Sequence, residues 1–348
     1  MDLLVLLLSF VVILVGAELF TNGIEWFGHK LGLGEGAVGS VLAAVGTALP
    51  ETTIPVVAIL FSPADAHASD VGVGAILGAP FMLSTLALGV TGLVVLAQAR
   101  RRSAGDSISV DPAVVLLDLC AFAVAYGIAI GAAFLPAEST WPKLVVAAVL
   151  LVLYGRYVKG HLSAESSIDA EGLNPLRLHP LDRGGPAAAD STPRMRVVAL
   201  QVLVGVGLII LGAIAFVGAV SDIARLIGVN EVLLALIVAP IATELPEAFN
   251  AVLWVRQGKD TLAMANITGA MVFQASIATI VALVFAPAAW AYMPGTRLAF
   301  ASAGIAFLSA AVVFYPIIRG RTLRARNLLL GAAFYAAYLA LVALAAGG

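Results

Sequence analysis

Gly46-Thr47-Ala48-Leu49-Pro50-Glu51 is a short polar stretch near the centre of a long apolar run. A carboxylate in the middle of a membrane helix is disfavoured by about 2.5–3.5 kcal/mol, so its presence there indicates a functional site. Pro50 has no backbone N–H and its ring crowds the Gly46 carbonyl, which predicts a kink that leaves this carbonyl free. On a helix, Thr47 and Glu51 share a face. A hydroxyl, a carboxylate and one or two carbonyls can therefore converge on one cation.

The composition places the chain among integral membrane proteins. It has 348 residues, of which 61% are hydrophobic and 11% charged, and its mean hydropathy is +1.04. These are too few charges to cover a water-soluble globule of this size. The net charge of −2 provides no basic surface for nucleic acid. We expect membrane lipid and inorganic cations as partners, and a monomer.

Ten apolar runs are each long enough to cross a hydrocarbon core of about 30 Å. They lie at about 3–27, 37–61, 72–98, 110–134, 142–159, 197–221, 231–255, 261–289, 297–318 and 326–346. The polar stretch 160–193 is rich in Ser, Asp, Pro and Gly and is typical of a loop. The first run has no basic residue before Lys30, so we interpret it as a membrane helix rather than a secretory signal. The expected fold is an all-α membrane protein with ten transmembrane helices.

The second half of the chain repeats the first. Residues 16–51 align without a gap on residues 212–247, with ten identities, and Thr243-Glu244-Leu245-Pro246-Glu247 is the second copy of the polar stretch. Because five helices is an odd number, the second copy enters the membrane from the opposite side, which makes the repeats inverted. The expected units are a first repeat, a cytoplasmic loop and a second repeat, at 1–160, 161–194 and 195–348. Inverted repeats with broken helices near the midplane are typical of secondary transporters.

The basic residues predict the orientation. If the helices alternate in direction, 16 of the 19 Lys and Arg residues lie on the same side as the 160–193 loop, and only Lys143, Arg225 and Arg297 lie on the other. By the positive-inside rule, this loop is cytoplasmic and both termini are extracytoplasmic. The expected location is the cell membrane, with multiple spans.

The duplicated pattern Gly-Ala, Gly-x-x-Glu and Thr-x-Leu-Pro-Glu, followed each time by a helix that starts with small residues, resembles the alpha repeats of the calcium/cation antiporter superfamily, in particular the sodium/calcium exchangers. The resemblance implies a secondary antiporter, not an enzyme, that exchanges a divalent cation by alternating access without a cofactor. It also implies that Glu51 and Glu247 bind the cation, assisted by Thr47 and Thr243. The carbonyls of Gly46 and of its counterpart Ala242 are further candidates.

Three other polar residues extend the predicted metal site. Glu244 lies three residues before Glu247 and is either a third ligand or proton carrier, or pairs with a polar neighbour. Asn266 and Gln274 face the site by the resemblance, but amides also form hydrogen bonds between membrane helices. Both interpretations of these amides stay open.

Departures from the family pattern affect the counter-ion. Ala79 and Ala270 replace serines that serve sodium in the family, and Leu83 and Gln274 replace asparagine and aspartate. A proton needs only one carboxylate, and the coupled pair Glu244 and Glu247 can provide it. We therefore expect Ca²⁺ as the divalent cation, with Mn²⁺ or another divalent as an alternative, and H⁺ in preference to Na⁺. A sodium/calcium exchanger with a reduced sodium shell, or a cation channel using the same glutamates, is the alternative.

The remaining polar residues have structural interpretations or open ones. Cys120 lies in an apolar run and is expected to be a packed thiol. Asp118, together with Asp111 on the same helix face, forms either a structural pair or a proton path. Glu18 and Glu25 either line an ion path or pair near the interface. All four histidines are expected to be solvated, namely His29, His67, His161 and His179.

Overall fold

A computed structural model describes residues 2–48, 52, 75–163, 173–181, 193–226, 244–293 and 296–347. Within these ranges the protein is helical apart from one small antiparallel sheet, in which β1 (Ser107–Ile108) pairs with β2 (Leu323–Arg324). Seven of the described helices are long and apolar enough to cross a membrane. The predicted all-α membrane fold is therefore confirmed.

The helices of the first half begin with α1 (Asp2–Lys30), followed by the π-helix η1 (Ala37–Ala43), which continues into α2 (Ala44–Thr47). A helical segment over Ala75–Gln98 then contains the π-helix η2 (Leu83–Ala87) and α5 (Leu88–Gln98). The half closes with α6 (Pro112–Ala132) and α7 (Thr140–Leu162). Helix α6 begins at Pro112, because the Asp111 carboxylate accepts from the Ala113 N–H at 2.8 Å and proline occupies the first turn.

The second half opens with a short 3₁₀ turn, η4 (His179–Leu181), and α8 (Met195–Leu226). Next come α11 (Leu245–Arg256), α12 (Asp260–Phe273), the π-helix η6 (Gln274–Ala278) and α13 (Thr279–Phe285). The chain ends with α14 (Arg297–Val313), α15 (Tyr315–Ile318) and α16 (Ala325–Gly347). Each of the ten apolar runs contains described helical residues, although parts of the second, third and seventh runs lie outside the described ranges.

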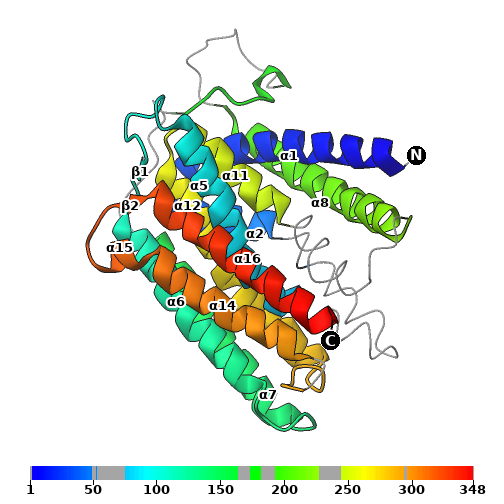
Figure 1. The fold of residues 1–348 in the computed structure, drawn as a ribbon. Helices are drawn as coiled ribbons and strands as arrows, with labels where there is room; N and C mark the ends of the chain where they lie inside the picture. The colour runs from blue at the N-terminus through cyan, green and yellow to red at the C-terminus, as the bar shows by residue number, and fades with distance from the viewer. Residues whose placement is uncertain are drawn as a thin grey trace.

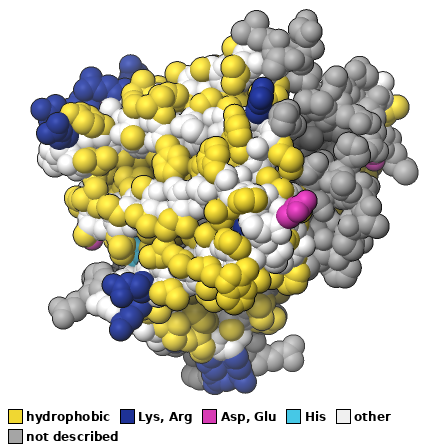
Figure 2. All heavy atoms as spheres, turned by 90° about the horizontal axis from the view of Figure 1, so that it is seen from below, with side chains coloured by type: hydrophobic (Ala, Val, Ile, Leu, Met, Phe, Trp, Pro, Cys, Tyr) yellow, Lys and Arg dark blue, Asp and Glu magenta, His cyan; other side chains and the backbone are white. Residues whose placement is uncertain are grey.

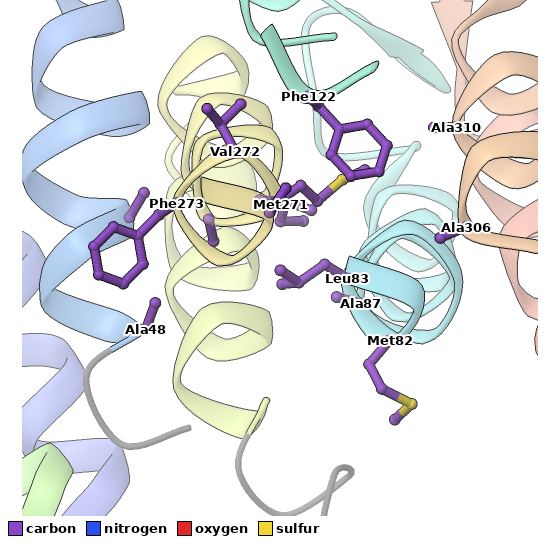
Figure 3. Packing of buried hydrophobic residues seen from close by; sticks show 14 of the residues in the cluster. Ala48, Met82, Leu83, Ala87, Phe122, Met271, Val272, Phe273, Ala306 and Ala310 are labelled. Carbon is purple, nitrogen blue, oxygen red and sulfur yellow. The ribbon is translucent and has the colours of Figure 1, made fainter. Parts of the chain in front are cut away.

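Helix α12 forms the centre of the molecule. All fourteen of its residues are buried, and in Figure 3 its Met271 lies between Phe122 of α6 and Leu83 of η2. A Cβ atom on Gly269 would lie 2.2 Å from the Ser40 carbonyl oxygen of η1. Helices α12 and η1 therefore cross in direct backbone contact, which only small residues allow.

Helices α1 and α8 form a pair that lies side by side and packs together (Figure 1). Their outer faces are largely exposed in the described structure, as are those of the other peripheral helices. Figure 2 shows an outer face that is mostly apolar, with basic side chains near its margins. Such a surface fits a lipid environment, where an apolar exterior has no cost.

Three connections and the last turns of α1 meet at one end of the bundle. The sheet joins the α5–α6 connection to the α15–α16 connection, and it lies on the opposite side of Figure 1 from both chain ends. Arg102 then reaches the start of α12, where it contacts Asp260 at 2.6 Å. Lys259 pairs with Glu25 of α1 at the same end. We call this the basic end.

Part of the predicted 160–193 loop is anchored to the membrane helices. The Nδ2 atom of Asn22 in α1 donates to the carbonyls of Asn174 (3.2 Å) and Pro175 (3.3 Å), and its Oδ1 atom accepts from the Arg177 N–H (3.0 Å). Gln201 of α8 donates to the same Oδ1 atom at 2.8 Å. The segment 173–181 is thus tied to both α1 and α8.

The prediction that Cys120 is a packed thiol is wrong. Its side chain is exposed, and Leu117 and Val124, one helical turn before and after it, are exposed as well. These three residues belong to the outer face of α6. Hydropathy cannot separate such a face from the core, because lipid-facing and core-facing positions are both apolar.

Candidate functional site

The two copies of the polar stretch meet through Asn266. Thr47 is fully buried at the end of α2, and its hydroxyl lies 3.3 Å from Asn266 Oδ1 and 3.1 Å from the Ala43 carbonyl oxygen. Asn266, from the centre of α12, donates through Nδ2 to the backbone oxygen of Glu247 at 3.5 Å. Residues about 200 positions apart in the chain are therefore brought to one buried place.

Two acidic residues lie at the start of α11. Glu244 immediately precedes the helix and Glu247 lies in its first turn, with a proline between them in the same turn. Both side chains are buried, Glu247 completely. The helix N-terminus directs its positive end toward this turn and favours negative charge there. Two buried carboxyl groups thus lie on the turn whose Glu247 backbone oxygen accepts from Asn266. Carboxylate, hydroxyl and amide oxygens are the type of ligands that hard cations prefer.

Asn250 is a candidate site residue that the sequence reasoning missed. It lies one turn after Glu247 on α11 and is fully buried, and neither its amide nitrogen nor its amide oxygen has a hydrogen-bond partner within the described ranges. Burying unpaired polar atoms costs about 1–3 kcal/mol each, so such a group requires an explanation. The sequence feature that could have revealed Asn250 is an amide three residues after a carboxylate in an otherwise apolar helix.

Gln274 connects η6 to the first polar stretch. Its Nε2 atom donates to the Thr52 hydroxyl at 3.0 Å, and this hydroxyl lies 2.6 Å from the Ala48 carbonyl oxygen. The contact is the interhelical hydrogen bond that the sequence offered as one of two interpretations. Three residues that replace polar residues of the family pattern are also buried: Ala79 and Leu83 in the Ala75–Gln98 segment, and Ala270 in α12.

The structure describes only part of the predicted ligand set. Glu51, Thr243 and Ala242 lie outside the described residues. Gly46 is described, and a Cβ atom there would lie 2.6 Å from the Phe20 ring, so α2 is held close to α1. No group of three His, Cys, Asp or Glu side chains suited to a metal ion occurs among the residues that can be described.

Glu18 and Glu25 form ion pairs rather than contacts with the site. Glu18 pairs with Arg177 at 2.6 Å on the surface. Glu25 is buried and accepts from the Trp254 indole at 2.6 Å, in addition to its pair with Lys259. These contacts favour the pairing interpretation over an ion path.

Glu35 lies at the basic end, just before η1. Burial raises the pKa of its carboxyl above the ordinary value of 4.5. A hydrogen bond with Thr261 and the positive charge of Lys259 oppose this rise in pKa, whereas the charges of Glu25 and Asp111 add to it. The pKa of the Glu35 carboxyl is therefore higher in the folded protein than in the unfolded chain.

The prediction that the histidines are solvated is wrong for His161. Its side chain is almost completely buried and its Nε2 atom lies 2.7 Å from an oxygen of Asp118 in α6. The position near the end of a helix suggested solvent, but tertiary packing covers it. His67 lies outside the described residues.

Comparisons with known proteins identify the family. The sequence profile described as "Sodium/calcium exchanger protein" matches residues 1–160 and 197–347. No curated protein matches the chain by sequence. Among solved structures, the sodium-calcium exchanger NCX_Mj soaked without Na⁺ and Ca²⁺ has a TM-score of 0.72 at 17% identity, covering 97% of this chain and 98% of that one.

Other states of the same exchanger have the same fold. NCX_Mj soaked with 2.5 mM Na⁺ and 0.1 mM Ca²⁺ has a TM-score of 0.71 at 16% identity, with 97% of each chain covered. NCX_Mj soaked with 100 mM Na⁺ and 10 mM Sr²⁺ has a TM-score of 0.70 at 16% identity, again with 97% of each chain covered. With the profile match over most of the chain, the protein belongs to the sodium/calcium exchanger family.

Proposed function

We propose that the protein is a secondary active antiporter that exchanges a divalent cation at a buried site between its two halves. Ca²⁺ is the first candidate for this cation. The observation that carries this proposal is the meeting of Thr47, Asn266 and the Glu247 backbone in the core. The full ligand set that we propose comprises both glutamates of the polar stretches and their neighbours: Glu51, Glu247, Thr47, Thr243, Glu244, Gly46, Ala242, Asn266, Gln274 and, in addition, Asn250.

The physical basis of exchange is the charge of the site. Two to three carboxylates offset the dehydration of a divalent cation. When that cation leaves, the carboxylates cannot remain together and ionised in a medium of low dielectric constant. The empty site must therefore bind protons or monovalent cations before it can open to the other side of the membrane. This requirement makes the exchange obligatory.

We propose that the architecture consists of two inverted repeats of five helices, at 1–160 and 195–348, with the 161–194 loop in the cytoplasm. The π-helices support this repeat, because η2 and η6 have five residues each and begin at Leu83 and Gln274, the residues that replace the asparagine and the aspartate of the family pattern. π-Helices are rare and are frequent at functional sites. The gathering of three connections at the basic end supports the alternation of helix directions.

We further propose H⁺ as the counter-ion and a monomer in the cell membrane. Buried Ala79, Ala270 and Leu83 offer no side-chain oxygen for a sodium ion, and the Gln274 amide donates to Thr52. Sodium is the second candidate, because the family profile is that of sodium/calcium exchangers. Calcium uptake into vesicles driven by an outward H⁺ gradient without sodium, and not by an outward Na⁺ gradient at symmetric pH, is the expected result. The opposite result would establish sodium.

The site assignment is tested with Glu247→Gln and Glu51→Gln, which remove charge and keep shape. Each variant should lose Ca²⁺ flux in proteoliposomes, whereas Glu138→Gln, in the exposed α6–α7 connection, should transport like the unmodified protein. Near-normal flux in either site variant would refute the assignment. Flux that needs no counter-ion on the opposite side would indicate a channel instead. A binding titration with Ca²⁺, Mn²⁺ and Mg²⁺ then identifies the divalent cation.

A further inference from the structure

Asp118 is the centre of a buried hydrogen-bond network that the proposed cation site does not use. Its side chain is fully buried in α6. Four side chains from three other helices reach its two carboxyl oxygens: Ser40 (2.8 Å), Tyr157 (2.9 Å), His161 (2.7 Å) and Thr268. A carboxylate has about four acceptor positions, so all of them are in use when Asp118 is ionised.

His161 places a titratable base on this carboxyl. Histidine is the side chain that gains and loses a proton in the physiological pH range. His161 lies near the end of α7, where the following Leu162 and Ser163 are exposed, so the path to solvent is short. Its Nδ1 atom faces Gly36, where a Cβ atom would lie 2.8 Å away. With one proton the Asp118–His161 pair is neutral, and without it a net negative charge remains buried.

The network has hydrogen-bond partners for more than one protonation state. A hydroxyl has one proton to donate. The Tyr157 hydroxyl can donate either to Asp118 or to the Ser40 carbonyl oxygen at 3.1 Å. The Thr268 hydroxyl can donate either to Asp118 or to the Met264 carbonyl oxygen at 2.9 Å. When the carboxyl holds the proton and accepts fewer bonds, both hydroxyls still find acceptors.

The other ionisable groups near Asp118 and His161 lie on the helices that pack around these two residues. On α7 these are Tyr157 and the neighbouring Tyr154, with exposed Lys159 further along. On α6, Asp111 caps the helix two turns earlier. On α12, Asp260 is paired with Arg102. Glu35 precedes η1 at the same end.

The network is connected mechanically to the cation site. Thr268 lies two residues after Asn266 on α12, and Ser40 lies on η1, which continues into Thr47. At this crossing, Gly269 contacts the Ser40 backbone. We propose that Asp118 and His161 together bind one proton at a site separate from the cation ligands, and that this proton controls exchange by setting how η1 packs on α12.

The proposal is tested by isotopic Ca²⁺–Ca²⁺ exchange, which needs no counter-ion gradient. At saturating Ca²⁺, the exchange rate of the unmodified protein should change at least threefold between pH 5 and 8 on the side of the basic end. His161→Gln should make this profile flat. His179→Gln, a matched change in the anchored 173–181 segment, should keep it. An unchanged profile in folded His161→Gln would overturn the proposal.

A second measurement does not depend on transport. In ¹⁵N-histidine-labelled protein, each of the four histidines gives two ring-nitrogen signals, and those of His29, His67 and His179 can be assigned from their Gln variants. The remaining His161 signal should shift between pH 5 and 8 and should change in Asp118→Asn. A signal that stays constant over this range would overturn proton binding at the pair. If exchange is absent but the signal titrates, the antiporter proposal fails and the proton site stands.

Discussion

Glu247 shows at the residue scale why the site requires a cation or a proton. Its side chain is fully buried at the first turn of α11. A helix N-terminus stabilises a nearby negative charge by about 0.3–1 kcal/mol, whereas the desolvation of a buried ion costs several kcal/mol. The helix N-terminus therefore offsets only a part of this cost. In the function that we propose, a bound cation or proton offsets a further part.

Asn250 and Asn266 should respond differently to the same substitution. Asn250→Leu should lower Ca²⁺ affinity about tenfold, equivalent to about 1.4 kcal/mol, without loss of thermal stability, because it removes buried amide atoms that have no described partner. Asn266→Leu should lower both affinity and stability, since it breaks the contacts with Thr47 and Glu247. Calorimetric titration and thermal unfolding measure the two effects. Unchanged affinity in Asn250→Leu would remove it from the site.

Glu35 should make stability depend on pH. Because its pKa is raised in the folded protein, its contribution to stability is complete below pH 4.5 and is lost as the pH rises through the raised value. Glutamine keeps the neutral shape at every pH. The difference in Tm, Glu35→Gln minus unmodified protein, should therefore increase from about pH 4 to pH 8. Thermal unfolding in detergent measures it, and Asp106→Asn, in an exposed ion pair with Arg324, serves as the control.

At the scale of elements, the crossing of η1 and α12 positions the site. Thr47 and Asn266 can meet because Gly269 and Gly39 allow these helices to touch along their backbones; a Cβ atom on Gly39 would lie 2.6 Å from that of Ala265. This crossing also brings Ser40 and Thr268 to Asp118. The cation site and the buried network therefore depend on one helix contact.

Gly269→Ala should separate these two helices. The added methyl group would overlap the Ser40 backbone, which cannot turn away as a side chain can, so we expect a loss of about 1–3 kcal/mol of stability and weaker Ca²⁺ binding. Gly304→Ala in α14 is the matched control, because nothing lies within 4 Å of its Cβ position, and it should be neutral or slightly stabilising. Equal behaviour of the two variants would contradict a tight crossing.

At the scale of the whole molecule, much of the architecture could be predicted. The apolar runs predict a membrane protein, because few structures other than helices can span a bilayer. The duplicated Thr-x-Leu-Pro-Glu stretch predicts that Thr47 and Glu247 lie close together, because carboxylates buried in a membrane are costly and mark functional sites. The sequence did not predict Asn250, His161 or the exposed Cys120. Their environments depend on helix rotation, and hydropathy does not report rotation when lipid and core are equally apolar.

The orientation can be measured by cysteine labelling. On a Cys120→Ser background, which removes the exposed native thiol, Ser191→Cys should react only from the cytoplasmic side and Gly347→Cys only from outside. This follows from the distribution of 16 of 19 basic residues on the side of the 160–193 loop. Intact cells and inverted vesicles with an impermeant maleimide provide the comparison. The reverse labelling pattern would invert the topology.

The lengths of α1 and α8 make bilayer thickness a variable in the function of this protein. These helices have 29 and 32 residues, or about 44 and 48 Å at 1.5 Å per residue, whereas a hydrocarbon core is about 30 Å thick. A membrane accommodates the excess by tilting them, and thicker membranes require less tilt. Since α1 and α8 pack together as a pair, tied at one end by segment 173–181, we expect them to change their tilt together. Lipids of longer acyl chain should therefore reduce the tilt of this pair, and the membrane itself would act as a ligand that selects among the tilted positions.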